Sequence, residues 1–373
     1  MTPMHALSKA PVAGRDTAAW LVADLECDTR WITHLDDADQ ADIAKVVKAA
    51  MVPGQPLLAY HRRDFPFSEA SLALIRRAFD EAQHGLGVAL IKRLPREGLS
   101  PEEFELLTWG IGLHFGVARP QDKQSRYINK VMDIGTVYRS AGGRGYSSNA
   151  ELDFHVDGSD VVLLSCYNQA SVGGDSMCSS AVTAFRWLQE ERPDLAAVLR
   201  EPFRFSRQGE QGEGKPPVHV NPVYAEHGGN LFCFWNRNRV LNATKLADAP
   251  PLTARQDEAI DLLDAILRRP QVMYLMRLEP GDLQILSNYT ALHSRTQFQD
   301  DEDSARKRML FRLWLAMPDA PALPDSWAGF FGSTSAGMVR GGVHGFQYDD
   351  SCIAFDARQA AELGMRFDPS VRP

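Results

Sequence analysis

The chain has 373 residues and a mass of 41.4 kDa, which is enough for one enlarged domain with a sizeable core. Its composition, 44% hydrophobic and 24% charged, is typical of an ordinary soluble globular protein and does not indicate global disorder. The formal net charge of −8 argues against a broad phosphate-binding surface, so we do not expect nucleic acid as a partner. A small molecule is the expected partner, and a homo-oligomer is compatible with the sequence.

The five cysteines are scattered and form no Cys-x-x-Cys pair, so we expect them to be reduced and mostly structural. The N-terminal segment has charged residues among short apolar stretches and lacks the apolar core of a secretory signal. The apolar run over 161–167 is far shorter than the roughly 20 residues of a membrane-spanning helix. The sequence therefore predicts a cytoplasmic protein without a membrane partner.

The first part of the chain is predicted to be mainly helical. Apolar residues at helical spacing, together with the capping residues Ser68 and Ser100, predict helices over 36–51, 68–84 and 101–114. A strand is expected between the last two, over 87–94. We expect residues 1–60 to form an N-terminal helical arm that packs on a single structural unit, residues 61–373.

From residue 127 onward the pattern changes to short apolar runs separated by Gly, Pro and Asn. These runs predict strands over 127–132, 161–167, 231–235, 272–278, 283–286 and 309–315. Helices are predicted at 181–191 and 253–269, the second with a clear apolar face. Several short strands with turns between them favour a sandwich or barrel within an α+β protein.

Two loops, 139–149 and 207–217, have compositions that do not favour regular structure, and either could be a mobile lid. We interpret 207–217 as a solvated surface connection. For 139–149 we favour a lid, because this loop directly precedes the most informative motif of the chain.

That motif is His155-Val156-Asp157. In a strand, residues i and i+2 point to the same face, so the two side chains can reach a common metal ion. The spacing alone is weak evidence, because a hydrogen-bonded histidine beside a turn aspartate would look the same. The chain itself has a second copy at His34 and Asp36, where Asp36 is better explained as a helix cap and His34 as a surface residue.

Four motifs in order add specificity: 153–158, 173–176, 288–295 and 307–315. Together they resemble the taurine and 2,4-dichlorophenoxyacetate dioxygenase superfamily over roughly residues 65–318. The resemblance implies a double-stranded β-helix, or jelly roll, with flanking helices. It also implies Fe(II) as the metal, with 2-oxoglutarate and O2 as co-substrates.

Carried over residue by residue, the resemblance gives His155, Asp157 and His293 as the metal ligands and catalytic centre. Two histidines and one carboxylate leave open positions on the metal and are diagnostic of oxygen-activating iron(II). Three further histidines lack a carboxylate two residues on and are interpreted as surface or structural residues: His219, His227 and His344.

The resemblance also implies three residues for co-substrate binding. Arg308 matches the strand arginine that pairs with the distal carboxylate of 2-oxoglutarate, a task suited to a planar guanidinium. Ser176 matches a hydroxyl residue that assists it. Arg312 should face the same side of the strand as Arg308 and either assist the co-substrate or bind an acidic substrate.

The implied reaction is hydroxylation of an unactivated C–H bond, with release of succinate and CO2. Asp157 disfavours halogenation, whereas desaturation, cyclisation and C–C cleavage stay open. The predicted substrate is a small organic acid or amino-acid-like metabolite, and candidate contacts are Arg139, Arg144, Arg295, Arg312, Tyr138, Tyr146, Trp235 and Tyr289. The alternatives are a non-catalytic metabolite sensor with the same core and a zinc-dependent hydrolase.

Overall fold

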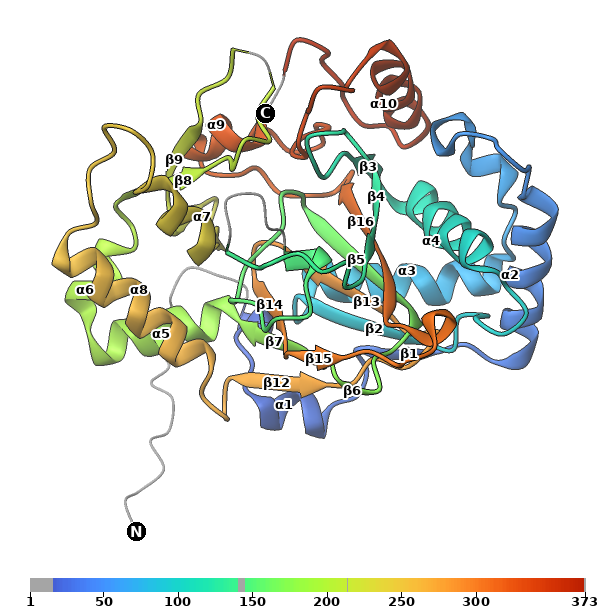
Figure 1. The fold of residues 1–373 in the computed structure, drawn as a ribbon, viewed down its shortest axis with the longest axis horizontal. Coiled ribbons are helices and arrows are strands. Elements are labelled where there is room, and N and C mark those ends of the chain that lie inside the picture. The colour runs from blue at the N-terminus through green and yellow to red at the C-terminus, as the bar shows by residue number, and fades with distance from the viewer. Residues whose placement is uncertain (1–15, 140–144, 213, 372–373) are drawn as a thin grey trace.

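The computed structural model describes residues 16–139, 145–212 and 214–371 (Figure 1). Its largest sheet has the strand order β1-β2-β13-β5-β16-β3, and β4 also pairs with β16. The pairing is parallel between β1 and β2 and antiparallel elsewhere. The bounds are β1 Ile32–His34, β2 Val88–Lys92, β3 Val117–Arg119, β4 Ile128–Val131, β5 Val161–Asn168, β13 Leu283–Ser287 and β16 Met309–Ala316.

A second, smaller sheet has the order β12-β7-β14 and packs against the inner face of the large one. Its strands are β7 Ser176–Ser180, β12 Met273–Met276 and β14 Ala291–Arg295. The remaining strands form two-stranded pairs: β6 Val172–Gly173 with β15 Phe298–Gln299, β8 Pro202–Ser206 with β9 Val218–Pro222, and β10 Tyr224–His227 with β11 Asn230–Cys233. This is the α+β jelly-roll core that the sequence predicts.

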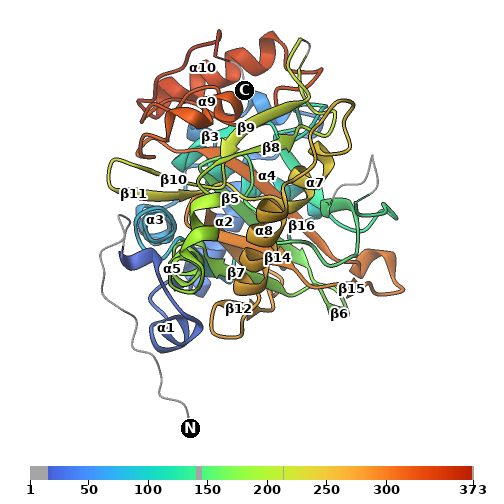
Figure 2. The ribbon, with the colours of Figure 1, turned by 90° about the vertical axis from the view of Figure 1, so that its left-hand side faces the viewer.

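Helices cover the core on two sides (Figures 1 and 2). The outer face of the large sheet packs against α2 Asp37–Ala50, α3 Glu69–His84 and α4 Pro101–Phe115. On the side of the small sheet lie α5 Ala181–Glu191, α6 Pro193–Val198 and α8 Ala254–Leu267. The other helices are α1 Val22–Cys27, α7 Arg237–Ala243, α9 Ala328–Phe331 and α10 Asp350–Glu362.

The alternation of side chains along β16 explains where the interior of the sandwich lies. Leu313 and Leu315 point outward into the core shared with the helices. Leu310 and Trp314 point inward, toward the small sheet. Arg312 lies between Leu310 and Trp314 on the same face of the strand. Its positively charged side chain therefore points into the space between the two sheets.

The predicted elements agree closely with the structure. The three N-terminal helices begin at their predicted caps, with Ser68 and Ser100 accepting hydrogen bonds from the first turns of α3 and α4. Asp36 likewise caps α2, and His34 is exposed, as expected for the second His-x-Asp copy. The segment before residue 60 contains β1 as well as α1 and α2, and the division of the chain at residue 60 stays a proposal.

All five cysteines are free thiols, and four of them are buried, which confirms their predicted structural character. No helix within the described ranges combines the length and the apolar composition needed to cross a bilayer.

The helix-covered face of the large sheet should carry much of the stability. Leu313 is fully buried, so Leu313→Ala is expected to lower the free energy of unfolding by about 2 to 5 kcal/mol. Leu275, which is 52% exposed on β12, provides a matched control, because the same substitution there removes little buried surface. Urea unfolding of both variants tests this, and equal losses would contradict the assignment of the core.

Candidate metal centre and active-site cavity

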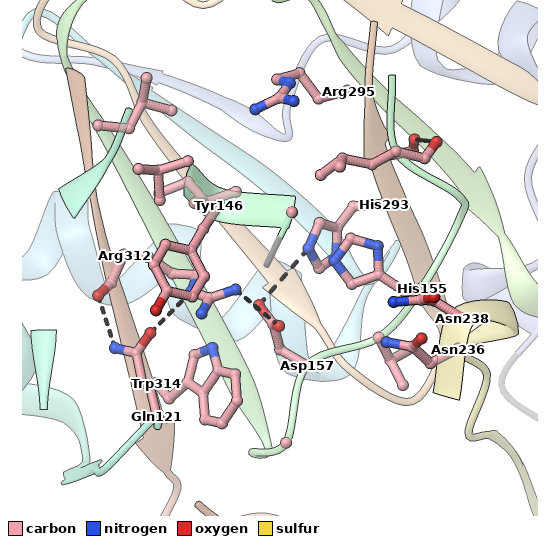
Figure 3. A pocket seen from close by; sticks show the side chains of 18 of the residues that line it. Gln121, Tyr146, His155, Asp157, Asn236, Asn238, His293, Arg295, Arg312 and Trp314 are labelled. Atoms are coloured by element: carbon pink, nitrogen blue, oxygen red, sulfur yellow. Dashed lines mark hydrogen bonds and ion pairs between the residues drawn. The ribbon is translucent and has the colours of Figure 1, made fainter. Parts of the chain in front are cut away.

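Two segments that are distant in the chain bring the predicted metal ligands together. His155 and His293 form an antiparallel bridge in which each backbone N–H donates to the other's carbonyl at 3.0 Å. Their imidazole centroids are therefore only 4.4 Å apart. Asp157 follows two residues later, and its Oδ2 lies 3.6 Å from Nε2 of His293 (Figure 3). One ligand atom from each residue lies within 4.8 Å of the other two.

The backbone around the first two ligands differs from the regular strand that the motif predicts. Residues 153–157 form no continuous strand, and His155 makes only isolated bridges, with His293 and with Asn236. The side chains of His155 and Asp157 nevertheless reach a common site, as the motif predicts. His293 itself lies on β14, which pairs with β7 on one side and forms the isolated bridge to His155 on the other.

Hydrogen bonds orient the ligand atoms. Nδ1 of His155 lies 2.8 Å from the carbonyl oxygen of Asp153, so its N–H donates there and Nε2 is left with a lone pair for a metal. Oδ1 of Asp157 accepts from Arg312 at 3.1 Å, whereas Oδ2 is buried and has no hydrogen-bond partner. A buried carboxylate oxygen without a donor is the atom that a cation would satisfy.

Electrostatics keep the three ligands in their metal-binding protonation states. Burial lowers the pKa of His155 and lowers that of His293 to about 3, so both rings are neutral at pH 7. Burial alone would raise the pKa of Asp157, but the adjacent guanidinium of Arg312 lowers it, so the carboxylate is ionised. Two neutral imidazoles and one carboxylate fit a first-row divalent ion such as Fe(II).

Arg308 lies in the same cavity as these ligands and is only 3% exposed. Its Nε donates to Oε1 of Gln169 at 3.2 Å, but Nη1 is buried without a partner. Within the described part of the chain, no carboxylate lies within ion-pair distance of this guanidinium. Burial lowers the pKa of Arg308 to about 10, yet the group stays charged at pH 7. A buried cation of this kind is suited to an anionic ligand.

Ser176 and Arg312 also line the cavity, but in different settings. The hydroxyl of Ser176 donates to Oε1 of Gln284 at 3.0 Å. Arg312 already has partners: Nη1 contacts Asp157, and Nε donates to Oε1 of Gln121 at 2.8 Å (Figure 3). All six predicted site residues therefore line one cavity. Arg312 lies beside Asp157, the carboxylate among the predicted metal ligands.

The cavity is partly open to solvent and is lined by the three predicted metal ligands and by Arg308. Four residues that we considered for the substrate line it: Tyr138, Tyr146, Arg295 and Arg312. The expectation is wrong for two aromatic residues outside its lining. Trp235 is fully buried and donates to Asp264, and Tyr289 is buried with its hydroxyl on Asp160. Arg139 forms an ion pair with Asp153, and Arg144 lies outside the described residues.

The prediction that 207–217 is a solvated surface connection is wrong for its first residues. Arg207 and Glu210 are buried, and Glu210 forms a 3.0 Å ion pair with Arg239 in the cavity wall. The pairing of β8 with β9 draws this loop back over the cavity. Residues 140–144 of the other loop lie outside the described residues, and therefore so does part of the predicted lid.

Several polar residues of the wall were not predicted from the sequence: Gln121, Gln208, Glu210, Asn236, Asn238 and Arg239. The run 235–239 offered a usable signal, because alternating Asn and Arg residues directly follow the apolar strand β11. Asn236 caps α7 and bridges to His155, so this polar run begins at the metal centre. Gln121, in contrast, has no recognisable motif around it.

Of the histidines predicted to be structural or surface residues, His219 is buried and its ring stacks on Phe205. His344 is buried beside Arg119, and His227 is exposed. None of the three approaches the metal ligands closely enough to join the cluster that the described residues form.

Comparison with known proteins places these features in a family context. The family model described as "Taurine catabolism dioxygenase TauD, TfdA family" matches residues 52–314. FR-33289 synthase of Streptomyces rubellomurinus is 30% identical over 328 residues, which are 87% of this chain and 95% of that protein. The taurine hydroxylase-like protein SAT17 of Stachybotrys chartarum is 23% identical over 312 residues, 80% of this chain and 78% of that protein.

Two solved structures share the fold. The non-haem iron oxygenase OrfP, in complex with Fe and alpha-ketoglutaric acid, has a TM-score of 0.57 at 17% identity and covers 76% of this chain and 94% of its own. Asparagine oxygenase, in complex with Fe(II), 3-hydroxyasparagine and succinate, has a TM-score of 0.56 at 20% identity, with 77% and 93% covered. At these identities the likeness confirms the jelly-roll fold.

Proposed function

Since the chain belongs to the taurine catabolism dioxygenase TauD, TfdA family, we propose that it hydroxylates a small organic acid or an amino-acid-like metabolite. It is an Fe(II)- and 2-oxoglutarate-dependent dioxygenase. When bound, the iron and the keto acid supply the oxidising chemistry, in which 2-oxoglutarate and O2 yield succinate, CO2 and a hydroxylated product.

This proposal rests on two buried polar atoms in one cavity, each of which lacks a hydrogen-bond partner. Oδ2 of Asp157 lacks a donor, and Nη1 of Arg308 lacks an acceptor. A divalent ion satisfies the first, and a dicarboxylic keto acid that chelates the ion satisfies the second. Residues of the chain therefore bind the metal and orient the co-substrate, and they hold both in a cavity with largely buried walls.

The charges of the cavity support an acidic substrate. Four arginines line it, Arg239, Arg295, Arg308 and Arg312, against two carboxylates, Asp157 and Glu210. Bound Fe(II) and the dianion of 2-oxoglutarate cancel each other, so a surplus of positive charge remains for the substrate. The solved relatives named for asparagine oxidation or complexed with hydroxylated arginine support an amino-acid-like molecule.

A substrate screen tests this charge argument. We expect organic acids and amino acids to accelerate succinate formation, and we expect the matched primary amides to do so at least about tenfold less, because each loses one charge-assisted contact. Succinate release under saturating Fe(II) and 2-oxoglutarate is the measurement. Equal stimulation by an acid and its amide would contradict an acid-binding cavity.

Two alternatives predict different behaviour. A metabolite sensor would bind the same ligands without forming succinate, and a zinc hydrolase would not need the guanidinium of Arg308 near the metal. Anaerobic addition of Fe(II) and 2-oxoglutarate to the apoprotein should produce the weak visible charge-transfer band of the chelate. A folded protein without this band would favour one of the alternatives.

We propose that Arg312 positions Asp157, the carboxylate ligand of the metal. Arg312→Gln is expected to reduce the rate of succinate formation about 10- to 100-fold, since Asp157 loses the charged donor that fixes its Oδ1. Arg306→Gln is the control, because that side chain is 69% exposed and lies outside the cavity lining. An unchanged rate with only a raised KM for the organic substrate would instead assign Arg312 to substrate binding.

The partners and the location of the protein are part of the same proposal. The negative net charge supports a small molecule rather than nucleic acid as the partner. A cytoplasmic location and a homo-oligomeric state are proposals that fractionation and sedimentation would test.

A further inference from the structure

A second arginine of the cavity lacks a counterion. Arg295 lies two residues after His293 on β14, so its side chain faces the same interior, and it is only 5% exposed. Its Nη2 donates to the carbonyl oxygens of Ser148 and Ala150, and its Nε to that of Thr296 at 3.3 Å. These partners are neutral, and Nη1 is buried without any. Among the described residues, no carboxylate lies within ion-pair distance.

Arg295 and Arg308 lie on the same aromatic ring. The guanidinium carbon of Arg295 is 4.7 Å from the ring centroid of Phe298, and that of Arg308 is 5.1 Å from it. Each cation gains a modest cation–π attraction from the ring. The two guanidinium groups nevertheless repel each other, because both are cations that contact the same ring.

The pairing of two strands brings Ser176, the hydroxyl residue proposed to assist co-substrate binding, beside Arg295. Arg295 on β14 is the direct cross-strand partner of Ser176 on β7, so the two side chains share one face of the small sheet. Gly174, with a φ of +74°, leaves the space that Arg308 needs, because a Cβ there would lie 3.0 Å from its Nε. Arg295, Arg308 and Ser176 thus come from three segments and line one cavity, where the Ser176 hydroxyl already donates to Gln284.

Arg295 and Arg308 are buried cations, and each has one N–H group without an acceptor. A single anion bound between them can satisfy both groups. A carboxylate has two oxygens and can accept from both guanidinium groups, which removes the repulsion and satisfies both donors. The resemblance assigns this task to the strand arginine, which is Arg308 here, and gives Arg295 no role in it.

We propose that Arg295 and Arg308 together bind the distal carboxylate of 2-oxoglutarate, so that Arg295 is a second co-substrate residue rather than a substrate contact. This inference rests on the proposed function. It predicts that Arg295 distinguishes keto acids with a distal carboxylate from those without one.

The test compares two keto acids in anaerobic titrations of the Fe(II)-loaded protein, followed by the charge-transfer band. 2-Oxoglutarate carries the distal carboxylate, and 2-oxopentanoate has the same chelating end without it. For Arg295→Gln we expect the Kd of 2-oxoglutarate to rise about 10- to 100-fold, with the Kd of 2-oxopentanoate unchanged within about twofold. Arg295→Lys, which keeps the charge, should show a smaller rise, and Arg306→Gln none.

The titrations distinguish a structural role of Arg295, a substrate-binding role and a failure of the proposed function. If Arg295→Gln weakens both keto acids equally, its contacts to Ser148 and Ala150 are structural and the inference is wrong. If both Kd values are unchanged while KM for the organic substrate rises, Arg295 binds the substrate and the inference is also wrong. If the wild-type protein binds neither keto acid, the proposed function itself fails, which is a different result from either.

Discussion

His293→Ala is expected to abolish tight Fe(II) binding and to reduce succinate formation by at least about 100-fold. Even the loss of an outer hydrogen-bond partner of a metal ligand typically reduces affinity or activity 10- to 100-fold, and a ligand itself should matter more. The substitution removes one of three donors whose ligand atoms lie within 4.8 Å of one another. Anaerobic Fe(II) titration and a succinate assay measure the two effects.

The chain has its own control for this experiment. His34 is followed by a carboxylate at the same spacing as His155, but it is exposed and Asp36 is used as a helix cap. His34→Ala should therefore leave iron affinity and turnover unchanged. Full iron binding by the His293 variant, or a loss in the His34 variant, would refute the assignment of the ligands.

Arg308→Met should have the second large effect, on co-substrate affinity. Removing one partner of a buried charge pair costs about 2 to 4 kcal/mol, so we expect the Kd of 2-oxoglutarate to rise about 30- to 1000-fold. The reason is that Arg308 offers a buried, unpaired N–H in the metal-containing cavity. The charge-transfer band of the anaerobic chelate measures this Kd directly.

The same variant should leave the ligand-free protein no less stable. Wild-type Arg308 is a buried cation without a carboxylate partner among the described residues, and methionine of similar length removes that unfavourable charge. Thermal unfolding without ligands tests this point. A large drop in stability, or a rise in Kd no greater than that of Arg306→Gln, would contradict a role in co-substrate binding.

Local rules were sufficient for the helices that cover the large sheet and for the central strands of that sheet. The caps Asp36, Ser68 and Ser100 determine where α2, α3 and α4 begin, and strongly apolar runs such as 161–167 determine the strands of the large sheet. The prediction missed several elements, among them β7 and β14 of the small sheet and the helices α1, α7 and α10. The residues of β14 are mixed in polarity, because its inward side chains are functional rather than apolar.

The candidate site could be predicted only where a motif marks it. His155, Asp157, His293 and Arg308 follow the order of the family's motifs, and the structure places them in one cavity. The contact between Gln121 and Arg312 depends on how β16 lies relative to the segment after β3, and no local pattern encodes that arrangement. The cavity wall at 207–210 likewise depends on the pairing of β8 with β9.

The most direct test of the metal centre is an iron-edge anomalous difference map from anaerobic crystals grown with Fe(II) and 2-oxoglutarate. We expect a single peak within bonding distance of Nε2 of His155, Nε2 of His293 and Oδ2 of Asp157, with the distal carboxylate of the keto acid against Arg308. A map with no iron among these three atoms, or with iron bound elsewhere, would contradict the account.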